Sequence, residues 1–344
     1  MVKVGMVGCG GITSAHLRGW LKVAETGQGK VVAAADITRD KAEALSGNVG
    51  GADVFTDYHE MLKRADIEAV DITLPHNLHR DAIVAAAEAG KHIICEKPLC
   101  LNLKEADDIK RVVEKSGVVM MCAHNNLFTP SVQAAKKLML DGMLGNLFLA
   151  RTIDIFLSSS YPPGPVTRET KKVRPEMKGW RAKRENMGGG ELIDTGYHPT
   201  YTLLYLVDSK PVEVTAMTGK YRLMNMDGED TAQVLVKFEN GAIGNILTGW
   251  SSEFPFGSYI FHLTGERGQL FGSRSAIYYK PPLLEPASRE LEPADTFTAE
   301  IEHFVDCIVN NREPIQTHAD GTAVLKVILA AYEAVAEGVT VRIE

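Results

Sequence analysis

The chain has 344 residues, 45% of them hydrophobic and 24% charged, with a formal net charge of −7 at pH 7. A chain of this length is longer than one that usually folds around a single hydrophobic core, so we expect about two domains of an ordinary globular protein. The negative charge, the lack of a basic block and the lack of an apolar run of roughly 18 to 20 residues argue against nucleic acid or a membrane as the main partner.

The chain begins directly with a strand-like run at residues 2–7, which leaves no room for a signal peptide, so we expect a cytoplasmic protein. The cysteines form neither a CxxC pair nor a zinc-type cluster. They are Cys9, Cys95, Cys100, Cys122 and Cys307. We therefore expect free thiols in a reducing compartment and no structural metal.

Residues 3–123 alternate apolar runs with helical stretches. Continuous apolar runs suit parallel strands buried on both faces, and they occur at 4–6, 31–35, 69–72, 92–95 and 118–122. Helices are predicted at 80–89 and 103–115, the second with Asn102 as N-cap and Glu105 three residues later. Gly90 and Gly117 stand where helix C-caps should fall. This order of βαβ units predicts a doubly wound parallel sheet.

The second part of the chain has a different pattern. A helix is predicted at 130–140, and strands with alternating side chains follow at 146–156, 212–221, 232–238, 242–250 and 259–264. Residues 239–241 read as a hairpin turn, so the sheet should be mostly antiparallel. Helices at 298–311 and 319–337 end the chain. The stretch 158–178 is long, polar and without a period, and we interpret it as a functional loop or lid.

A glycine-rich turn joins the first strand to a helix. Its candidate cofactor contacts are Gly8, Gly10, Gly11 and Ile12. Such a turn lets the backbone approach a pyrophosphate at a helix N-terminus, although Thr13 stands where the fingerprint prefers Gly or Ala. Asp36 ends the second strand, where an acidic residue binds the adenosine ribose. The carboxylate favours NAD over NADP, but nearby Arg39 leaves NADP open, and a turn-capping role for Asp36 is the simpler alternative.

Two more strand ends should reach the same edge of the sheet, where ligands bind in such folds. The first supplies Thr73, Leu74, Pro75, His76 and Asn77 as candidate cofactor contacts. His79, which starts the next helix, suits a structural role equally well. The second ends at Glu96-Lys97-Pro98, where the proline forces the chain out of the sheet beside an ammonium group. Taken alone, such a lysine is more commonly a solvent-exposed side chain.

A second candidate centre follows three glycines at 188–190. Asp194 and His198 are four residues apart, which on a helix places both on one face and lets the carboxylate orient the imidazole. An imidazole held in this way is suited to accept a hydroxyl proton. Pro199 should kink the helix. An isolated Asp/His pair at this spacing is usually a surface pair, so the pattern alone leaves both interpretations open.

In their order along the chain, these segments resemble the Gfo/Idh/MocA oxidoreductases. The matching stretches are GCGGITSAH at 8–16, ITLPHNLH at 72–79, AGKHIICEKPL at 89–99, HNNLFTP at 124–130, GWRAKRENMGGGELIDTGYH at 179–198 and FENGAIG at 238–244. They span essentially the whole chain. Leu127 replaces a frequent Arg, Tyr201 replaces a frequent Asp, and Thr13 departs from the glycine fingerprint; the first two changes should alter substrate contacts.

The resemblance implies an NAD(P)-binding Rossmann domain at 1–123 and a substrate-binding α/β domain at 124–344. The open sheet of the second domain would also form a homodimer or homotetramer. Lys97 and His198 are implied to meet at the nicotinamide with Asp194 beside them, as the catalytic residues. The implied contacts include, for the cofactor, Glu96, Lys97 and Asn125, and, for the substrate, Lys97, Asn125, Trp180, Arg181, Asp194, Tyr197 and His198.

We therefore expect an NAD(P)-dependent dehydrogenase that oxidises a secondary hydroxyl of a sugar, cyclitol or related polyol, or catalyses the reverse reduction. His198 would accept the hydroxyl proton and Lys97 would stabilise the alkoxide, although Lys97 is an alternative base if its pKa is lowered. Two other functions stay open. One is glycoside cleavage through transient oxidation by tightly held NAD, and the other is a non-catalytic NAD-binding sensor.

Overall fold

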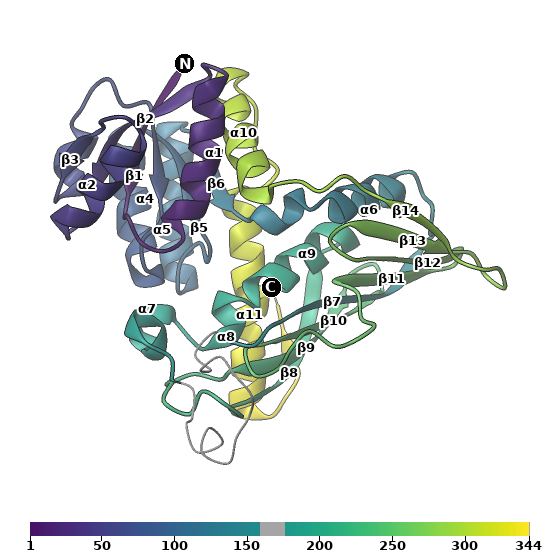
Figure 1. The fold of residues 1–344 in the computed structure, drawn as a ribbon. Helices are drawn as coiled ribbons and strands as arrows, with labels where there is room; N and C mark the ends of the chain where they lie inside the picture. The colour runs from purple at the N-terminus through teal and green to yellow at the C-terminus, as the bar shows by residue number, and fades with distance from the viewer. Residues whose placement is uncertain (159–175, 344) are drawn as a thin grey trace, which may run out of the picture. The chain divides into compact units, whose positions relative to one another are not determined.

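The computed structural model describes residues 1–158 and 176–343, and the chain divides into two compact units. The first unit comprises Met1–Phe128 and Ala294–Thr322, and the second comprises Thr129–Pro293 and Ala323–Glu344. Figure 1 traces the elements of each unit along the chain. Most of the predicted loop at 158–178 lies outside the described residues.

The first unit is built on a parallel sheet with strand order β3-β2-β1-β4-β5-β6. Its strands are β1 (Val2–Val7), β2 (Gly29–Ala35), β3 (Asp53–Phe55), β4 (Ala69–Ile72), β5 (His92–Glu96) and β6 (Met120–Ala123). Its helical elements are α1 (Thr13–Glu25), α2 (Arg39–Asn48), α3 (Tyr58–Leu62), η1 (His76–Leu78), α4 (His79–Glu88), α5 (Leu103–Ser116), η2 (Asn125–Phe128) and α10 (Thr296–Val309). This is the predicted doubly wound sheet.

Local signals in the sequence account for the ends of α5. The Asn102 side chain accepts a hydrogen bond from the Glu105 backbone N–H at 3.0 Å, and the Glu105 carboxylate accepts from the Leu101 N–H in return. Gly117 closes the helix in the left-handed conformation, with φ of 67°. The predicted helix start and C-cap are both confirmed.

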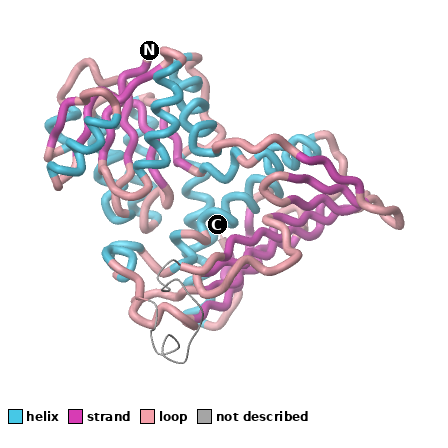
Figure 2. The backbone as a smooth tube through the Cα atoms, in the orientation of Figure 1, coloured by secondary structure: helices cyan, strands magenta, loops and turns pink. Residues whose placement is uncertain are grey.

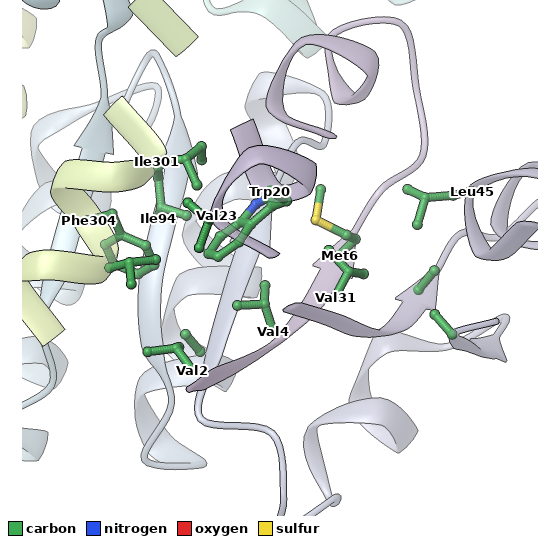
Figure 3. Packing of buried hydrophobic residues seen from close by; sticks show 14 of the residues in the cluster. Val2, Val4, Met6, Trp20, Val23, Val31, Leu45, Ile94, Ile301 and Phe304 are labelled. Atoms are coloured by element: carbon green, nitrogen blue, oxygen red, sulfur yellow. The ribbon is translucent and has the colours of Figure 1, made fainter. Parts of the chain in front are cut away.

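The core of the first unit draws on the end of the chain as well as its beginning. Figure 3 shows Trp20 of α1 packed among strand residues such as Val4, with Ile301 and Phe304 of α10 beside it. Helices α1 and α10 lie side by side, and the Trp20 and Phe304 rings meet edge to face at 6.4 Å between centroids. Although α10 follows the second sheet in sequence, its apolar face is therefore buried in the first unit.

The second unit contains a broad sheet with strand order β14-β13-β12-β11-β7-β10-β9-β8-β15, drawn as magenta strands in Figure 2. The strands are β7 (Leu147–Ile155), β8 (Pro211–Gly219), β9 (Thr231–Phe238), β10 (Ile243–Gly249), β11 (Phe261–Gly265), β12 (Gly268–Gly272), β13 (Ala276–Lys280), β14 (Ala287–Glu290) and β15 (Val341–Arg342). Only the β7–β10 pair is parallel among the described strand pairs of this sheet, so the expected mostly antiparallel sheet is confirmed.

The helical elements of the second unit are α6 (Pro130–Leu140), η4 (Gly179–Ala182), α7 (Arg184–Met187), α8 (Glu191–Asp194), α9 (Tyr197–Val207) and α11 (His318–Glu337), whose first residues belong to the first unit. Helix α9 packs against β7 and β10, α8 against β9 and β10, and α6 against β12 and β13. Along β9 the buried and exposed residues alternate, which leaves the other face of the strand accessible.

All five cysteines are free thiols, as expected, and four of them are buried. Burial, with a smaller contribution from the Asp36 charge, raises the pKa of Cys9 to about 12, and burial also raises the pKa of Cys100 to about 12. Burial raises the pKa of Cys307 to about 11. Across residues 1–158 and 176–343, no helix is both long enough and apolar enough to cross a membrane.

Candidate active site

The glycine-rich turn between β1 and α1 has the geometry of a phosphate-binding turn. Gly8 has φ of +90°, and a Cβ there would lie 3.0 Å from the Thr73 carbonyl oxygen, so the position requires glycine. A Cβ on Gly10 or Gly11 would meet no atom of the described residues within 4 Å. Among the same residues, no side chain caps the start of α1 at Ile12. The first backbone N–H groups of α1 are therefore available to a ligand, and two exposed glycines lie beside them. A diphosphate requires such free N–H donors at a helix start.

Thr13, the departure from the glycine fingerprint, ties the turn to the end of β4. Its hydroxyl lies 2.8 Å from the Thr73 hydroxyl, and both hydroxyls lie within hydrogen-bond distance of the Gly8 carbonyl oxygen, at 3.2 and 2.8 Å. Thr13 and Thr73 are buried. The extra side chain therefore forms hydrogen bonds that a Gly or Ala could not.

Asp36 lies beside the turn, at the end of β2. One carboxylate oxygen accepts the Cys9 N–H and the other accepts the Thr38 N–H, each at 2.8 Å. Asp36 thus has the turn-capping role, while each oxygen keeps a lone pair for a further donor such as a ribose hydroxyl. Arg39 forms an exposed ion pair with Glu43 at 2.8 Å along α2. The sequence-predicted Asp36 is adjacent to the turn, and Arg39 is directed to its own helix.

The chain after β4 forms the short turn η1 before α4. His76 is buried, whereas Asn77 is exposed. His79 is fully buried, with Nε2 2.9 Å from the Leu74 carbonyl oxygen and Nδ1 2.7 Å from the Pro98 carbonyl oxygen. Burial is the main cause that lowers the pKa of His79. His79 is therefore a structural link between two predicted contact segments.

The Glu96-Lys97-Pro98 segment turns out of the sheet at the end of β5. Lys97 is partly exposed, while Glu96 is buried and accepts the Lys97 backbone N–H at 3.0 Å. The Lys97–Pro98 peptide bond is cis. In the same unit, Asn125 donates to the Thr296 hydroxyl at 2.8 Å, which links η2 to the start of α10. Lys97 and the dinucleotide turn therefore belong to strand ends at one edge of the sheet.

In the second unit, the expected single helix carrying Asp194 and His198 is wrong. The chain forms two short helices, since α8 ends at Asp194 and α9 starts at Tyr197. Between them, the Gly196 N–H donates to the Glu191 carbonyl and the His198 N–H donates to the Thr195 carbonyl, so the regular four-residue repeat is interrupted. The break precedes Pro199, which lies in the first turn of α9, where a missing N–H leaves no helical bond unmade.

Asp194 is buried and ion-paired with Arg181. The Arg181 Nε donates to Asp194 Oδ2 at 2.7 Å, and its guanidinium carbon lies 4.3 Å from the centre of the Trp180 ring. Trp180 packs in turn against a buried cluster that includes Met187 and Trp250. Three sequence-predicted residues are therefore brought together, with the Arg181 guanidinium partly exposed.

Other predicted residues of this unit lie differently. Tyr197 is fully buried, and its ring centroid lies 6.4 Å from that of Tyr201. His198 is partly exposed. Sequence reasoning missed Thr195, whose hydroxyl accepts the Trp250 indole N–H at 2.8 Å. It also missed Glu191, a buried acid between the glycine run and Asp194, although an acidic residue within an apolar stretch was a usable signal.

The residues of the first unit fit a dinucleotide cofactor. The turn offers uncapped backbone N–H groups at a helix start, open space over Gly10 and Gly11, and the Asp36 carboxylate at the end of β2. Within the described residues, there is no group of three or more His, Cys, Asp or Glu side chains that could hold a metal ion.

Comparison with known proteins agrees with this geometry. The chain matches the oxidoreductase family with an NAD-binding Rossmann fold at residues 2–124 and the GFO/IDH/MocA C-terminal domain at residues 132–271. It is 27% identical to 1,5-anhydro-D-fructose reductase of Ensifer adhaerens, over 100% of this chain and 99% of the relative. It is 26% identical to scyllo-inositol 2-dehydrogenase (NAD(+)) of Bacillus subtilis strain 168, over 92% and 89%.

A solved structure has the same fold over nearly the full length. Aldose-aldose oxidoreductase from Caulobacter crescentus, complexed with glycerol, superposes with a TM-score of 0.85 and 25% identity, covering 99% of each chain. The two family matches fall on the parallel-sheet part and the antiparallel-sheet part of the chain. With its dinucleotide turn, its Glu-Lys-Pro segment and its second sheet, the chain belongs to the Gfo/Idh/MocA family of NAD-binding oxidoreductases.

Proposed function

We propose that this oxidoreductase transfers hydride between NAD and a secondary hydroxyl of a sugar, cyclitol or related polyol. The observation that carries the proposal is the pairing of a dinucleotide turn with Lys97 at a strand end of the same sheet. Relatives over nearly the whole chain are named as a sugar-derivative reductase and an inositol dehydrogenase, which supports the substrate class. Asp36 at the end of β2 favours NAD over NADP.

In this proposal the substrate loses the proton of its hydroxyl oxygen and a hydride from the carbon that bears this hydroxyl, and a carbonyl forms. When bound, NAD supplies the hydride acceptor. The imidazole of His198 accepts the hydroxyl proton, and the Lys97 ammonium stabilises the negative charge that develops on the oxygen. Asp194, whose carboxylate is fixed by the hydrogen bond from Arg181, places its charge beside these reacting groups. Trp180, Arg181 and Asn125 contribute polar and aromatic contacts to the substrate.

We further propose that the open face of the second sheet binds another copy of the chain, as a homodimer or homotetramer. Apolar side chains on neighbouring strands are exposed there, namely Leu149 of β7, Ile243 of β10, Leu235 of β9 and Met217 of β8. Exposed apolar residues on adjacent strands are typical of a subunit interface. Light scattering of the intact chain measures this directly, and a monomer would contradict the proposal.

The catalytic roles are tested by replacing His198 and Lys97. His198→Ala should lower turnover by roughly two to four orders of magnitude, because a general base contributes that much, while NAD affinity stays nearly unchanged. Lys97→Met should lower turnover similarly. The measurement is NADH absorbance with a panel of sugars and cyclitols, together with calorimetric titration of NAD.

Matched variants outside the site separate these effects from general damage. His262→Ala in β11 removes another partly exposed histidine of the second unit, and Lys104→Met removes a lysine on the exposed face of α5. Both should retain the parent turnover. Near-normal turnover of His198→Ala would exclude His198 as the base, and silence of the parent with every substrate would contradict the dehydrogenase proposal.

A further inference from the structure

Behind the strand end that carries Lys97 lies a fully buried histidine. His16, near the start of α1, has Nδ1 3.0 Å from both carboxylate oxygens of Asp71 and Nε2 3.0 Å from Glu96 Oε1. Asp71 lies in β4 and also accepts the Trp20 indole N–H at 2.7 Å. The imidazole thus bridges two adjacent strands of the sheet through their acidic side chains.

This arrangement favours a charged ring, because both ring nitrogens face an acidic side chain. A neutral imidazole has one N–H and one lone pair, so one nitrogen would present its lone pair to a carboxylate, whereas an imidazolium donates to both. Burial alone would lower the pKa of His16, but Asp71 and Glu96 together raise it well above the usual value. Glu300 of α10, also fully buried, interacts electrostatically with the same groups, and burial raises its pKa well above normal, which favours its neutral form.

Glu96 connects this charge to Lys97. One carboxylate oxygen binds His16, and the other accepts the Lys97 backbone N–H at 3.0 Å. Although burial favours the neutral acid, the His16 hydrogen bond and charge lower the pKa of Glu96, with smaller contributions from Lys97 and His79. On the far side of Lys97, the Pro98 carbonyl oxygen lies 2.7 Å from His79 Nδ1. The backbone is therefore held on both sides of Lys97.

We propose that His16 is a positioning residue, whose charged ring fixes Glu96 and, through Glu96, the backbone from which the Lys97 ammonium extends. This inference rests on the proposed role of Lys97 in hydride transfer. A rigid support for a reacting group matters because small displacements of the group raise the barrier strongly. His16 contacts neither the substrate nor the cofactor in this role.

The charge of His16 can be measured without any substrate. In the full chain labelled with ¹⁵N-histidine, the His16 resonances, assigned by comparison with His16→Gln, should show both ring nitrogens protonated at pH 7. A neutral tautomer at pH 7 would overturn the proposal. This result does not depend on whether the chain oxidises a sugar.

The positioning role is measured by a series at Glu96 with Asp71 as the matched control. Glu96→Ala removes the acceptor for the Lys97 N–H, Glu96→Gln keeps an oxygen there, and Asp71→Ala removes the other His16 partner without touching Lys97. We expect Glu96→Ala to accelerate hydrogen exchange of the Lys97 amide by at least about tenfold. Glu96→Gln and Asp71→Ala should change it less than about threefold.

Turnover should follow the same order. Glu96→Ala should lower kcat by about 10- to 100-fold with little change in KM for NAD, and Glu96→Gln should restore most of the loss. Equal losses in Glu96→Ala and Asp71→Ala would indicate a merely structural network and overturn the proposal. If the parent has no turnover, the proposed function fails, and the amide exchange still decides whether Glu96 holds Lys97.

Discussion

Each of the two units encloses a cluster of acidic side chains, and the clusters differ in what faces the carboxyl groups. In the first unit, Asp71 and Glu96 face the His16 imidazole. In the second, Glu191 and Glu229 face hydroxyls: Thr248 donates to Glu191, and Tyr332 donates to Glu229 at 3.0 Å. The two units thus bury the same kind of group beside different partners.

The partners determine which form of the acid is buried. His16 lowers the pKa of Glu96 against the effect of burial, so that carboxylate is ionised. Burial raises the pKa of Glu191 well above normal, and it raises the pKa of Glu229 although backbone N–H groups and Arg184 oppose it. A hydroxyl compensates the loss of water much less than an imidazolium does, so burial favours the protonated form of the acids in the second cluster. The comparison predicts opposite responses to mutation and pH.

The largest effect should come from removing the cation of the first cluster. His16→Gln leaves two buried carboxylates without their positive partner, and we expect it to lower the free energy of unfolding by about 3–5 kcal/mol. Because folding raises the pKa of His16, its contribution to the free energy of unfolding is complete below its ordinary pKa of 6.5. Because folding lowers the pKa of Glu96, the contribution of Glu96 is complete above its ordinary pKa of 4.5.

The loss in His16→Gln should therefore be largest between these two pH values, and it should shrink as the pH falls through the pKa of Glu96. Urea unfolding followed by circular dichroism at several pH values measures it. A loss below about 1 kcal/mol at pH 5.5 would show that the two clusters do not differ in the way proposed.

A smaller effect is expected from the hydroxyl of the second cluster. The Tyr332 hydroxyl accepts the Gly190 N–H at 3.1 Å and donates to Glu229. Tyr332→Phe leaves this N–H without its partner but removes no charged group, so the loss should be about 1–3 kcal/mol. Tyr205→Phe, which removes a hydroxyl that accepts a long bond, 3.4 Å, from Gln133, is the control and should cost less.

The smallest change should come from Glu191→Gln. Glu191 has one carboxyl oxygen with no hydrogen-bond partner among the described residues, and a neutral amide replaces a neutral acid. The variant should lie within about 1 kcal/mol of the parent at pH 5. Because a raised pKa makes the parent lose stability as the pH rises above 4.5, the variant should be relatively more stable at pH 8. The same difference in unfolding free energy at both pH values would contradict a neutral Glu191.

Much of the fold was predictable because its signals are local. Apolar runs located β1, β2, β4, β5 and β6, and Asn102 and Gly117 marked the ends of α5. The strands β3 and β12 to β15 were not predicted; β3 and β15 have only three and two residues, too few to show a period. The packing of α10 in the first unit depends on contacts with α1, which no local pattern contains.

The sequence predicts which residues belong to the site, but it does not predict the hydrogen bonds that join them to the rest of the sheet. Asp36, Lys97 and the Arg181–Asp194 neighbourhood follow from motifs. His16, Asp71 and Glu96 are separated by up to 80 positions, so their hydrogen bonds follow only from the order of strands in the sheet. The break between α8 and α9 was missed because Thr195 and Gly196, the C-cap of α8 and the N-cap of α9, both keep helical backbone angles, and Pro199 is accommodated in the first turn of α9.

The raised pKa values of the cysteines also determine how this protein can be labelled. A thiol with a pKa of about 12, as for Cys9 and Cys100, is a thiolate in roughly one molecule in 10⁵ at pH 7, and only the thiolate attacks a maleimide. Native thiols should therefore react far more slowly than a cysteine introduced at an exposed position such as Lys104. Fluorophores can then be attached at chosen surface positions without first replacing the native cysteines.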